Sequence, residues 1–290
     1  MSSIFAQNEY SVLDTVVIGL LNNSNGDLSE MTPINDTFKY NYNINNIPSK
    51  SKIIDELTMY INKLKNNNIN VLRPEPIKAL NDYNNQLYIR DLGFVINNIF
   101  FISSLTCNIR KPELMGLSNI IDTYISNIIK IPENINIEGG DVIIDNNDIY
   151  IGIGTRTSME GIEFVSSYID FNYNVLSIEH KCTHLECCFN VIDNDTVLIC
   201  KELVVNYPPH NIYFKYKNVI EITKEESELM MTNILSIGHR TIVINKSDKN
   251  KRINTLLNTL GFKLIQIDFN SNNLLGGGFR SASLPLNRIS

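Results

Sequence analysis

The sequence "EGGDVIIDNNDIYIGI", residues 138–153, contains the pattern that decides the fold of this chain. It begins with the polar residue Glu138, continues through an apolar run, turns at Asn and Asp residues, and ends in a second apolar run. Two apolar runs joined by an Asn/Asp turn predict a β-hairpin. The stretches "RDLGFVINNIFFIS" (residues 90–103) and "HLECCFNVIDNDTVLIC" (residues 184–200) have the same design and predict two more hairpins.

The polar residues at the heads of the three hairpins recur at a nearly constant interval. Asp91, Glu138 and His184 are separated by 47 and 46 residues, and a period in this range indicates repeated supersecondary units. Apolar residues at helical spacing predict helices within residues 49–67, 112–129 and 223–235, the last with a capping box of Thr223 and Glu226. Further strands are predicted within residues 14–20, 69–74, 174–180, 241–246 and 263–269.

Strand, helix and hairpin thus recur about five times along the chain. If equivalent units are arranged around one axis, equivalent positions face one another at the centre. Asp91, Glu138, His184 and the loop from Gly276 to Ser281 would then converge. No Pro-, Gly- or Ser-rich linker divides the sequence, so residues 1–290 are expected to form a single catalytic domain.

The composition excludes several classes of protein. With 290 residues, 43% of them hydrophobic, the chain can form a packed core, and its net charge of −6 argues against nucleic acid or an anionic membrane surface as the main partner. No apolar stretch approaches the ~20 residues of a membrane helix, and no basic leader opens the sequence, so the cytoplasm is the expected compartment. Five cysteines without a CxxC pair indicate reduced thiols. Because the sequence has no cofactor motif or metal-ligand cluster, we expect neither a cofactor nor a metal.

The residues at the heads of the hairpins suit a cationic substrate. A histidine beside a carboxylate is held in one tautomer and can carry protons near neutral pH. Carboxylates facing a planar cation bind it through paired, charge-assisted hydrogen bonds. Carboxylates, a histidine and a nucleophile position together indicate a site for a guanidinium group. Among the four histidines only His184 heads a hairpin, and we expect His180, His210 and His239 on the surface or in loops.

Five ordered motifs resemble those of the guanidino-group modifying enzymes, a superfamily that contains arginine deiminase, arginine dihydrolase, dimethylarginine dimethylaminohydrolase and the amidinotransferases. The motifs are "NQLYIRDLGFVI", "IEGGDVI", "IGIGTRTSMEGIEF", "HLECCFNV" and "GGGFRSASLPL", and they extend over nearly the whole chain. The resemblance implies an α/β fold, a five-bladed α/β propeller (pentein) with its active site in a central channel. It also implies a small guanidino substrate and no cofactor. Family members often form homodimers, so the resemblance also implies a homodimer as a partner state.

The resemblance also implies a role for each motif residue. Glu138 would orient and charge His184, which would move protons as general acid and base. Asp91 would hold the guanidinium, and Arg156 would bind the carboxylate of the substrate. Glu186 lies where deiminases usually have Asp, and Arg280 would either contact the substrate or only pair with neighbouring acids. The residues implied to bind substrate are Asp91, Asn85, Glu186, Arg156 and Arg280.

The family's nucleophile is a cysteine, and Ser281 stands at its position in this chain. In the family's mechanism a thiolate attacks the guanidino carbon, ammonia or an amine leaves, and a covalent thiouronium intermediate passes to water or to an acceptor amine. Because a serine hydroxyl ionises far less readily than a thiol, we expect this chain to bind substrate with little or no turnover. The serine is either a replacement of the catalytic cysteine or the mark of a natural pseudoenzyme. Cys187 and Cys188 are expected to pack in the strand and not to act as displaced nucleophiles.

The motifs favour hydrolysis of free L-arginine, by a dihydrolase that gives ornithine, ammonia and carbon dioxide or by a deiminase that gives citrulline. Asn85 near the "RD" motif, the "EGGD" motif and the compact size fit the dihydrolases best. Dimethylarginine hydrolases are also compact, but their C-terminal motif usually lacks the triple glycine. Amidinotransferases share "GGGF" but typically have His where this chain has Arg280. Amidino transfer to an amine acceptor and guanidinium binding without catalysis are the two alternatives.

Overall fold

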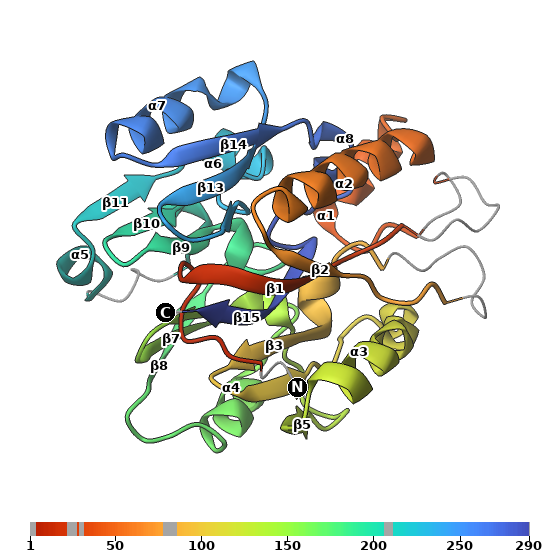
Figure 1. Ribbon diagram of the computed structural model, residues 1–290, viewed down its shortest axis with the longest axis vertical. Helices are drawn as coiled ribbons and strands as arrows, with labels where there is room; N and C mark the ends of the chain where they lie inside the picture. Colours follow the sequence, from red (N-terminus) through yellow and green to blue (C-terminus); the bar gives the residue numbers. More distant parts are fainter. Residues whose placement is uncertain (1–3, 22–27, 29–31, 78–85, 206–210, 290) are drawn as a thin grey trace.

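The computed structural model describes residues 4–21, 28, 32–77, 86–205 and 211–289. These residues form five three-stranded sheets, which are the blades of a propeller (Figure 1). In every blade the middle strand pairs antiparallel with one neighbour and parallel with the other. The five-bladed α/β propeller predicted from the resemblance is therefore confirmed.

The three predicted hairpins each form the antiparallel half of one blade. Asn97 and Asn146 have left-handed backbone at two of the hairpin turns (φ 53° and 56°), a conformation that asparagine tolerates and two-residue turns require. The blades consist of β3 (Gly93–Ile96), β4 (Ile99–Ile102) and β5 (Ile128–Lys130); β6 (Val142–Asp145), β7 (Asp148–Ile153) and β8 (Asn174–Glu179); β9 (Phe189–Asp193), β10 (Thr196–Ile199) and β11 (Asn218–Glu221); β12 (Leu235–Ser236), β13 (Thr241–Asn245) and β14 (Lys263–Ile267); and β15 (Ser283–Ile289), β1 (Val12–Ile18) and β2 (Asn70–Leu72).

Helices make the crossover that each parallel pair of strands needs. These crossover helices lie around the outside of the sheets in Figure 1. They are α1 (Asp36–Asn43) and α2 (Lys50–Lys65) in the first crossover, then α3 (Ser118–Tyr124), α4 (Met159–Ser166), α5 (Asn211–Lys215) and α7 (Lys251–Thr259). The short helices α6 (Lys224–Glu228) and α8 (Asn270–Asn273) connect consecutive blades. Among the described residues, no helix has both the length and the apolar character needed to cross a membrane.

The predicted helix within residues 49–67 is confirmed as α2, which buries Ile53, Leu57, Tyr60 and Leu64 on one face. The other two predictions are only partly correct. Residues 112–129 divide into a 3₁₀ stretch, α3 and the start of β5. The capping box before α6 is present, but the helix ends at Glu228, because Met230 has left-handed backbone (φ 62°) that breaks the helical path.

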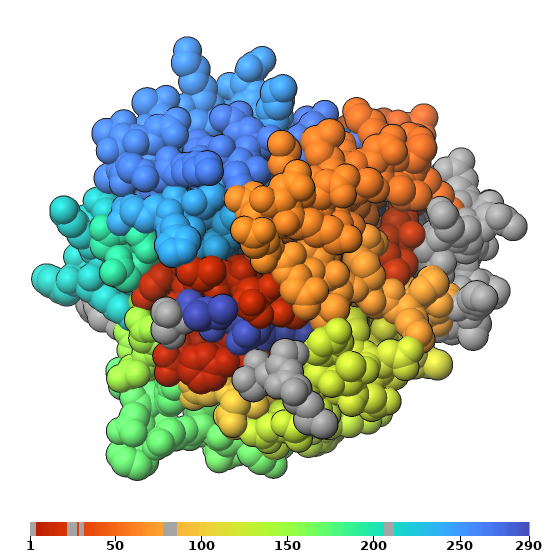
Figure 2. Space-filling model, viewed as in Figure 1, coloured from red at the N-terminus to blue at the C-terminus, as the bar shows by residue number. Residues whose placement is uncertain are grey.

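One blade is built from the two ends of the chain. Strands β1 and β15 pair antiparallel from Val12 with Ile289 to Ile18 with Ser283. In the space-filling view of Figure 2 their residues, coloured red and blue, lie side by side near the middle of the face. The Arg288 side chain continues the connection to the next blade, since it donates a hydrogen bond of 2.9 Å to the Ser236 carbonyl in β12. Pairing between the two ends thus completes the ring of blades.

Candidate active site

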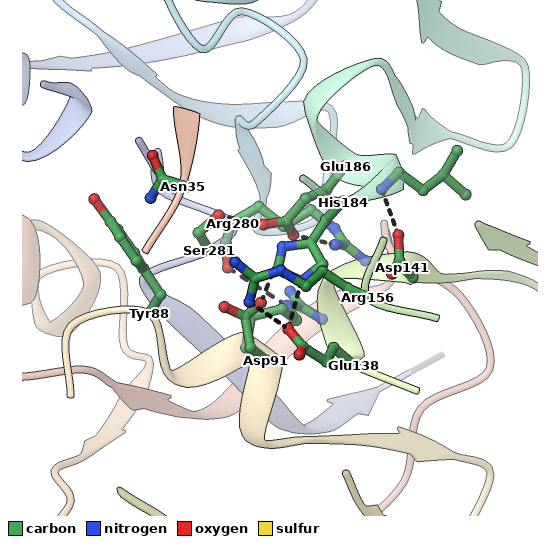
Figure 3. A network of polar contacts seen from close by, with 12 residues as sticks. Asn35, Tyr88, Asp91, Glu138, Asp141, Arg156, His184, Glu186, Arg280 and Ser281 are labelled. Carbon is green, nitrogen blue, oxygen red and sulfur yellow. Dashed lines mark hydrogen bonds and ion pairs between the residues drawn. The ribbon is translucent and has the colours of Figure 1, made fainter. Parts of the chain in front are cut away.

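Polar residues precede the first strand of every blade, and four of those named from the sequence come together. Asp91 lies in the 3₁₀ turn before β3, Glu138 directly before the turn that leads to β6, His184 before the turn that leads to β9, and Ser281 before β15. In Figure 3 their side chains gather at one place between the strand ends. The repeat spacing therefore places residues that are far apart in the chain around a common centre.

Glu138, His184 and Asp91 form a continuous buried chain of acid, imidazole and acid. The Nε2 atom of His184 lies 2.8 Å from Oε2 of Glu138, and its Nδ1 atom lies 3.5 Å from Oδ1 of Asp91. The backbone N–H of Thr106 donates to the second oxygen of Glu138 at 2.9 Å. Gly140 of the "EGGD" motif permits this packing, because a Cβ atom there would lie 2.7 Å from the imidazole and 2.8 Å from the Asp91 carboxylate.

The charges in this chain of contacts stabilise one another. Burial opposes a charged imidazole, but the Asp91 charge and the Glu138 hydrogen bond outweigh it and raise the pKa of His184 from 6.5 to about 10. Burial also opposes ionisation of Glu138, but the hydrogen bond and charge of His184 lower the pKa of that carboxyl from 4.5 to about 2. His184 is therefore an imidazolium at neutral pH in the unliganded site, and Glu138 is a carboxylate.

These shifts predict how the pair contributes to stability as pH changes. The raised pKa of His184 contributes fully below about pH 6.5 and is lost as pH rises toward 10, whereas the lowered pKa of Glu138 contributes above about pH 4.5 and is lost as pH falls toward 2. Urea unfolding of the wild type and of a Glu138→Gln, His184→Gln double variant should differ most between these two limits, from pH 4.5 to 6.5. A difference in unfolding free energy that is constant from pH 4 to pH 9 would contradict this coupling.

Arg110 is a site residue that the sequence patterns did not reveal. Its Nη1 atom contacts Oδ2 of Asp91 at 2.6 Å, and its other nitrogens contact the Glu113 carboxylate at 3.0 to 3.2 Å. All three side chains are buried. Arg110 fixes one oxygen of Asp91, while Oδ1 of Asp91 has no hydrogen-bond partner among the described residues. The free oxygen is the one that faces His184.

Asn233 is a second site residue that was missed, and here the spacing contained a signal. It precedes β12 at 49 residues after His184 and 48 before Ser281, so it heads the blade of β12, β13 and β14. Its Nδ2 donates to the Ser281 hydroxyl at 2.9 Å, and its Oδ1 accepts from the Ser281 backbone N–H at 2.9 Å. Asn233 therefore fixes both the backbone and the side chain of Ser281.

Glu186 and Arg280 form an ion pair next to the Ser281 side chain. The carboxylate of Glu186 accepts hydrogen bonds from the Ser281 hydroxyl and from Arg280. Arg280 is 1% exposed, and its Nη2 also donates to Glu9 and to the Val142 carbonyl, both at 2.8 Å. Of the two roles open to Arg280 in the sequence, these contacts match pairing with neighbouring acids.

Arg156 enters the site from the loop between β7 and α4. One guanidinium nitrogen lies 3.6 Å from Glu138 and has no hydrogen-bond partner among the described residues, while the other donates to the Ile34 carbonyl. Figure 3 shows Arg156 beside His184 and facing Ser281. Asn85 lies outside the described residues. The small pocket at this centre is lined by Ile34, Asn35, Tyr88, Asp91, Arg110, Arg156, Thr183, His184, Gly276 and Ser281.

Three buried side chains, those of Asp91, His184 and Glu186, could offer ligand atoms to a metal ion, although the sequence predicts no metal. One donor atom each from Asp91, His184 and Glu186 lies within 4.8 Å of the others. Asp91 is already paired with Arg110, Glu186 with Arg280, and Nε2 of His184 with Glu138. Because these cations already balance both carboxylates, the arrangement favours proton transfer over the binding of a divalent ion.

His180 does not lie on the surface or in an exposed loop, so that expectation is wrong. Its side chain is buried, and its Nε2 atom lies 2.9 Å from Oδ1 of Asp141, the last residue of the "EGGD" motif. Asp141 also accepts a hydrogen bond of 2.7 Å from the Leu185 backbone N–H. His239 is exposed, as expected, and His210 lies outside the described residues. Burial of a histidine depends on a partner distant in sequence, which the local pattern does not show.

The five-bladed fold and the match to a family model place the chain among the pentein-type guanidino-group modifying enzymes. The sequence model of the family described as "N,N dimethylarginine dimethylhydrolase, eukaryotic" matches residues 25–287. The chain is also similar to the uncharacterized protein YkgA of Bacillus subtilis, with 30% identity over 256 residues that cover 88% of this chain and 86% of that protein. The chain belongs to this dimethylarginine dimethylhydrolase family.

More distant similarities agree with this placement. The N(G),N(G)-dimethylarginine dimethylaminohydrolase of Pseudomonas aeruginosa is 22% identical over 241 residues, which cover 82% of this chain and 89% of that protein. The N-terminal domain of ArgZ, a cyanobacterial arginine dihydrolase solved as a cysteine-to-serine mutant bound to substrate, superposes with a TM-score of 0.80 at 16% identity. That alignment covers 94% of this chain and 98% of the ArgZ domain. At this identity the ArgZ structure supports the fold alone.

Proposed function

We propose that this site takes the guanidino group of an arginine-type amino acid and belongs to a hydrolase that works through a covalent intermediate at position 281. The observation that carries the proposal is that Asp91, His184 and Ser281 line one pocket. Glu138 lies behind His184 and contacts its imidazole at 2.8 Å. With serine at position 281 the protein binds its substrate and turns it over little or not at all. The chain as a whole acts as one catalytic domain.

The charges of the pocket support a role for each residue. Oδ1 of Asp91 is free to accept from a guanidinium N–H, and a charge-assisted hydrogen bond of this kind holds the cation in place. Nη1 of Arg156 lies 3.6 Å from Glu138 but has no hydrogen-bond partner among the described residues, so it can donate to the carboxylate of the amino acid. His184, protonated beside Glu138, donates its proton to the departing nitrogen and then accepts one from water.

Position 281 explains the weak reactivity that we propose. In a cysteine form the thiolate sulfur attacks the guanidino carbon, the bond to the departing nitrogen breaks, and water later releases the carbon from sulfur. The Ser281 hydroxyl instead donates a hydrogen bond to Glu186 and keeps its proton. Arg280 forms an ion pair with Glu186 and so keeps that carboxylate beside Ser281. We assign Arg280 no contact with the substrate.

Free L-arginine is the first substrate candidate, because the sequence motifs favour it. An N-methylated arginine is the second candidate, and a specific observation in the pocket favours it. Of the described residues that line the pocket, Asp91 alone carries a carboxylate, because Glu186 is turned toward Ser281 and Arg280. One carboxylate holds one edge of the guanidinium and leaves the other edge free for methyl groups. The family to which the chain belongs supports the same substrate.

Binding to the serine protein tests this proposal directly. We expect calorimetry to detect binding of L-arginine or dimethylarginine, and Asp91→Asn to weaken it by roughly 10- to 100-fold, because a hydrogen bond to a charged group contributes about 1.5–3 kcal/mol. Asp170→Asn, a change at an exposed acid, is the matched control and should leave the affinity unchanged. Equal affinity for the uncharged analogue citrulline, or no effect of Asp91→Asn, would refute a guanidinium site.

A further inference from the structure

Two residues that act as a pair in the site come from different blades. Glu138 precedes β6 and His184 precedes β9, and among the described residues these two strands belong to separate sheets. No pairing between β6 and β9 therefore sets the distance between the two residues. The hydrogen bond of 2.8 Å between their side chains still requires a fixed separation, because such bonds weaken steeply as their geometry departs from the optimum. The backbone at both residues thus needs a further connection.

Asp141 provides this connection through its fully buried carboxylate. Its Oδ1 atom accepts a hydrogen bond of 2.7 Å from the N–H of the peptide bond between His184 and Leu185. Its Oδ2 atom accepts one of 2.6 Å from the Thr157 hydroxyl, and that hydroxyl accepts from the Glu138 backbone N–H at 3.2 Å. The backbone N–H of Asp141 donates to the Glu138 carbonyl at 3.0 Å. One aspartate therefore holds the backbone of both members of the pair.

His180 attaches the segment of His184 to the same carboxylate a second time. Its side chain is buried, and its Nε2 atom lies 2.9 Å from Oδ1 of Asp141. Together with the contact at Leu185, this contact fixes the segment on both sides of His184. Gly152 permits the close packing, because a Cβ atom there would lie 2.6 Å from Oδ1 of Asp141 and 2.6 Å from Nε2 of His180. The carboxylate and the imidazole therefore have little room to move.

The groups in this cluster do not face the substrate. Asp141, Thr157 and His180 are 0%, 1% and 5% exposed, and none of them is among the described residues that line the pocket. In Figure 3 Asp141 lies on the opposite side of His184 from Tyr88, which lines the pocket. The cluster can therefore affect a reaction only through the residues that it holds.

We propose that Asp141 is a positioning residue that sets the hydrogen bond between Glu138 and His184. Thr157 and His180 extend its hold to the two backbone segments. The inference rests on the proposed function where it assigns proton transfer to His184, but the pair can be measured without substrate. If the positioning is lost, the imidazole no longer lies where it can protonate the departing nitrogen, and the reaction slows.

The charge of His184 reports this positioning. A hydrogen bond to the imidazolium stabilises it, so a longer bond lowers the pKa of His184. The charged side chains that face the imidazole are those of Glu138, Asp91, Glu186 and Arg156. Because Thr157 carries no charge, removal of its hydroxyl disturbs the positioning and leaves all of these charges in place. Asp141→Asn would instead also remove a charge that raises the pKa of His184.

Thr157→Val tests the inference in the substrate-free protein. We expect the pKa of His184, followed by NMR of its imidazole, to fall from about 10 by roughly 0.5–1 pH unit. Thr157→Ser restores the hydroxyl and should restore the pKa. Thr196→Val is the matched control and should leave it unchanged. The Thr196 hydroxyl is also buried, donates to a carboxylate at 2.6 Å and accepts from an amide N–H at 3.1 Å, but it lies at the turn end of the β9–β10 hairpin.

An unchanged pKa of His184 in Thr157→Val would overturn the proposal, and so would an equal fall in Thr196→Val. Thr157→Ala takes the place of the valine variant if that variant does not fold. The signals of His184 are identified by their loss in His184→Gln.

Kinetics in the Ser281→Cys protein add a second readout. Thr157→Val should lower kcat roughly 10- to 100-fold and leave KM within about twofold, because partners behind a functional residue have effects of this size. A rise in KM with unchanged kcat would show that Thr157 acts through the neighbouring Arg156, which would contradict the proposal. If Ser281→Cys has no activity, the proposed hydrolysis fails, and the pKa of His184 in the serine protein still decides whether Asp141 positions the pair.

Discussion

Replacing Ser281 with cysteine is expected to raise the rate of guanidino hydrolysis by roughly 10⁵-fold or more, from a level near the detection limit. Loss of the nucleophile has an effect of this size in hydrolases that work through a covalent intermediate. The other groups that the reaction needs are present around position 281, because Asn233 binds the backbone N–H of Ser281 and His184 carries a proton at neutral pH. A thiol at this position is ionised by the neighbouring imidazolium and by the bound cation, which a hydroxyl is not.

The products of the Ser281→Cys protein distinguish the reactions that the family catalyses. Ornithine with ammonia and carbon dioxide indicates a dihydrolase, citrulline with ammonia a deiminase, and citrulline with dimethylamine a dimethylarginine hydrolase. Little turnover until an amine is added indicates amidino transfer. Ser281→Ala is the control and should remain inactive, and His184→Ala in the cysteine background should remove the gained activity. Binding without any gain on Ser281→Cys would contradict hydrolysis and identify a guanidinium-binding pseudoenzyme.

Replacing Arg280 with methionine is expected to lower the free energy of unfolding by about 3–5 kcal/mol, because it removes the cation of one buried carboxylate and leaves a second with only the more distant Arg90, at 3.9 Å. Those carboxylates belong to Glu9 and Glu186, whose side chains are 8% and 0% exposed. Burial opposes ionisation of Glu9, but the charges of Arg280 and Arg90 lower its pKa to about 2, so the negative charge at Glu9 depends on these arginines.

A surface arginine provides the comparison for this prediction. Arg252 pairs with Glu226, and its side chain is 47% exposed. Arg252→Met should therefore change the unfolding free energy by only about 0–1 kcal/mol. Urea titrations of the two variants at neutral pH measure the difference. If Arg280→Met lowered the unfolding free energy no more than Arg252→Met does, the buried ion pairs of Arg280 with Glu9 and Glu186 would not stabilise the fold, which would contradict this prediction.

The repeat explains why so much of this site could be predicted from the sequence. A hairpin with a polar head recurs near every 47 residues, and the heads of equivalent blades necessarily meet at the axis. Asp91, Glu138 and His184 follow from that rule. Asn233 follows from it too, but its hairpin contains the two-residue strand β12, which is too short for an apolar pattern to reveal.

Other contacts depend on three-dimensional partners that no local pattern contains. Arg110 belongs to a crossover segment and reaches Asp91 from outside the repeat. The pairing of His180 with Asp141 joins residues 39 positions apart. Spacing locates the equivalent positions of a repeat, whereas burial and charge pairing depend on what else packs there.

The pairing of β1 with β15 has a consequence for folding. Among the described residues, the pairing of β1 with β15 closes the longest loop between two strands, so it has the greatest loop-closure entropy of the strand pairings and is expected to form late. Ser281 lies just before β15 and lines the pocket. We therefore expect the pocket to be complete only after β15 has paired with β1. A ligand held between Asp91 and Ser281 would connect this blade to the neighbouring blade that begins with β3, and saturating ligand should slow amide exchange in β15 and β3 more than elsewhere.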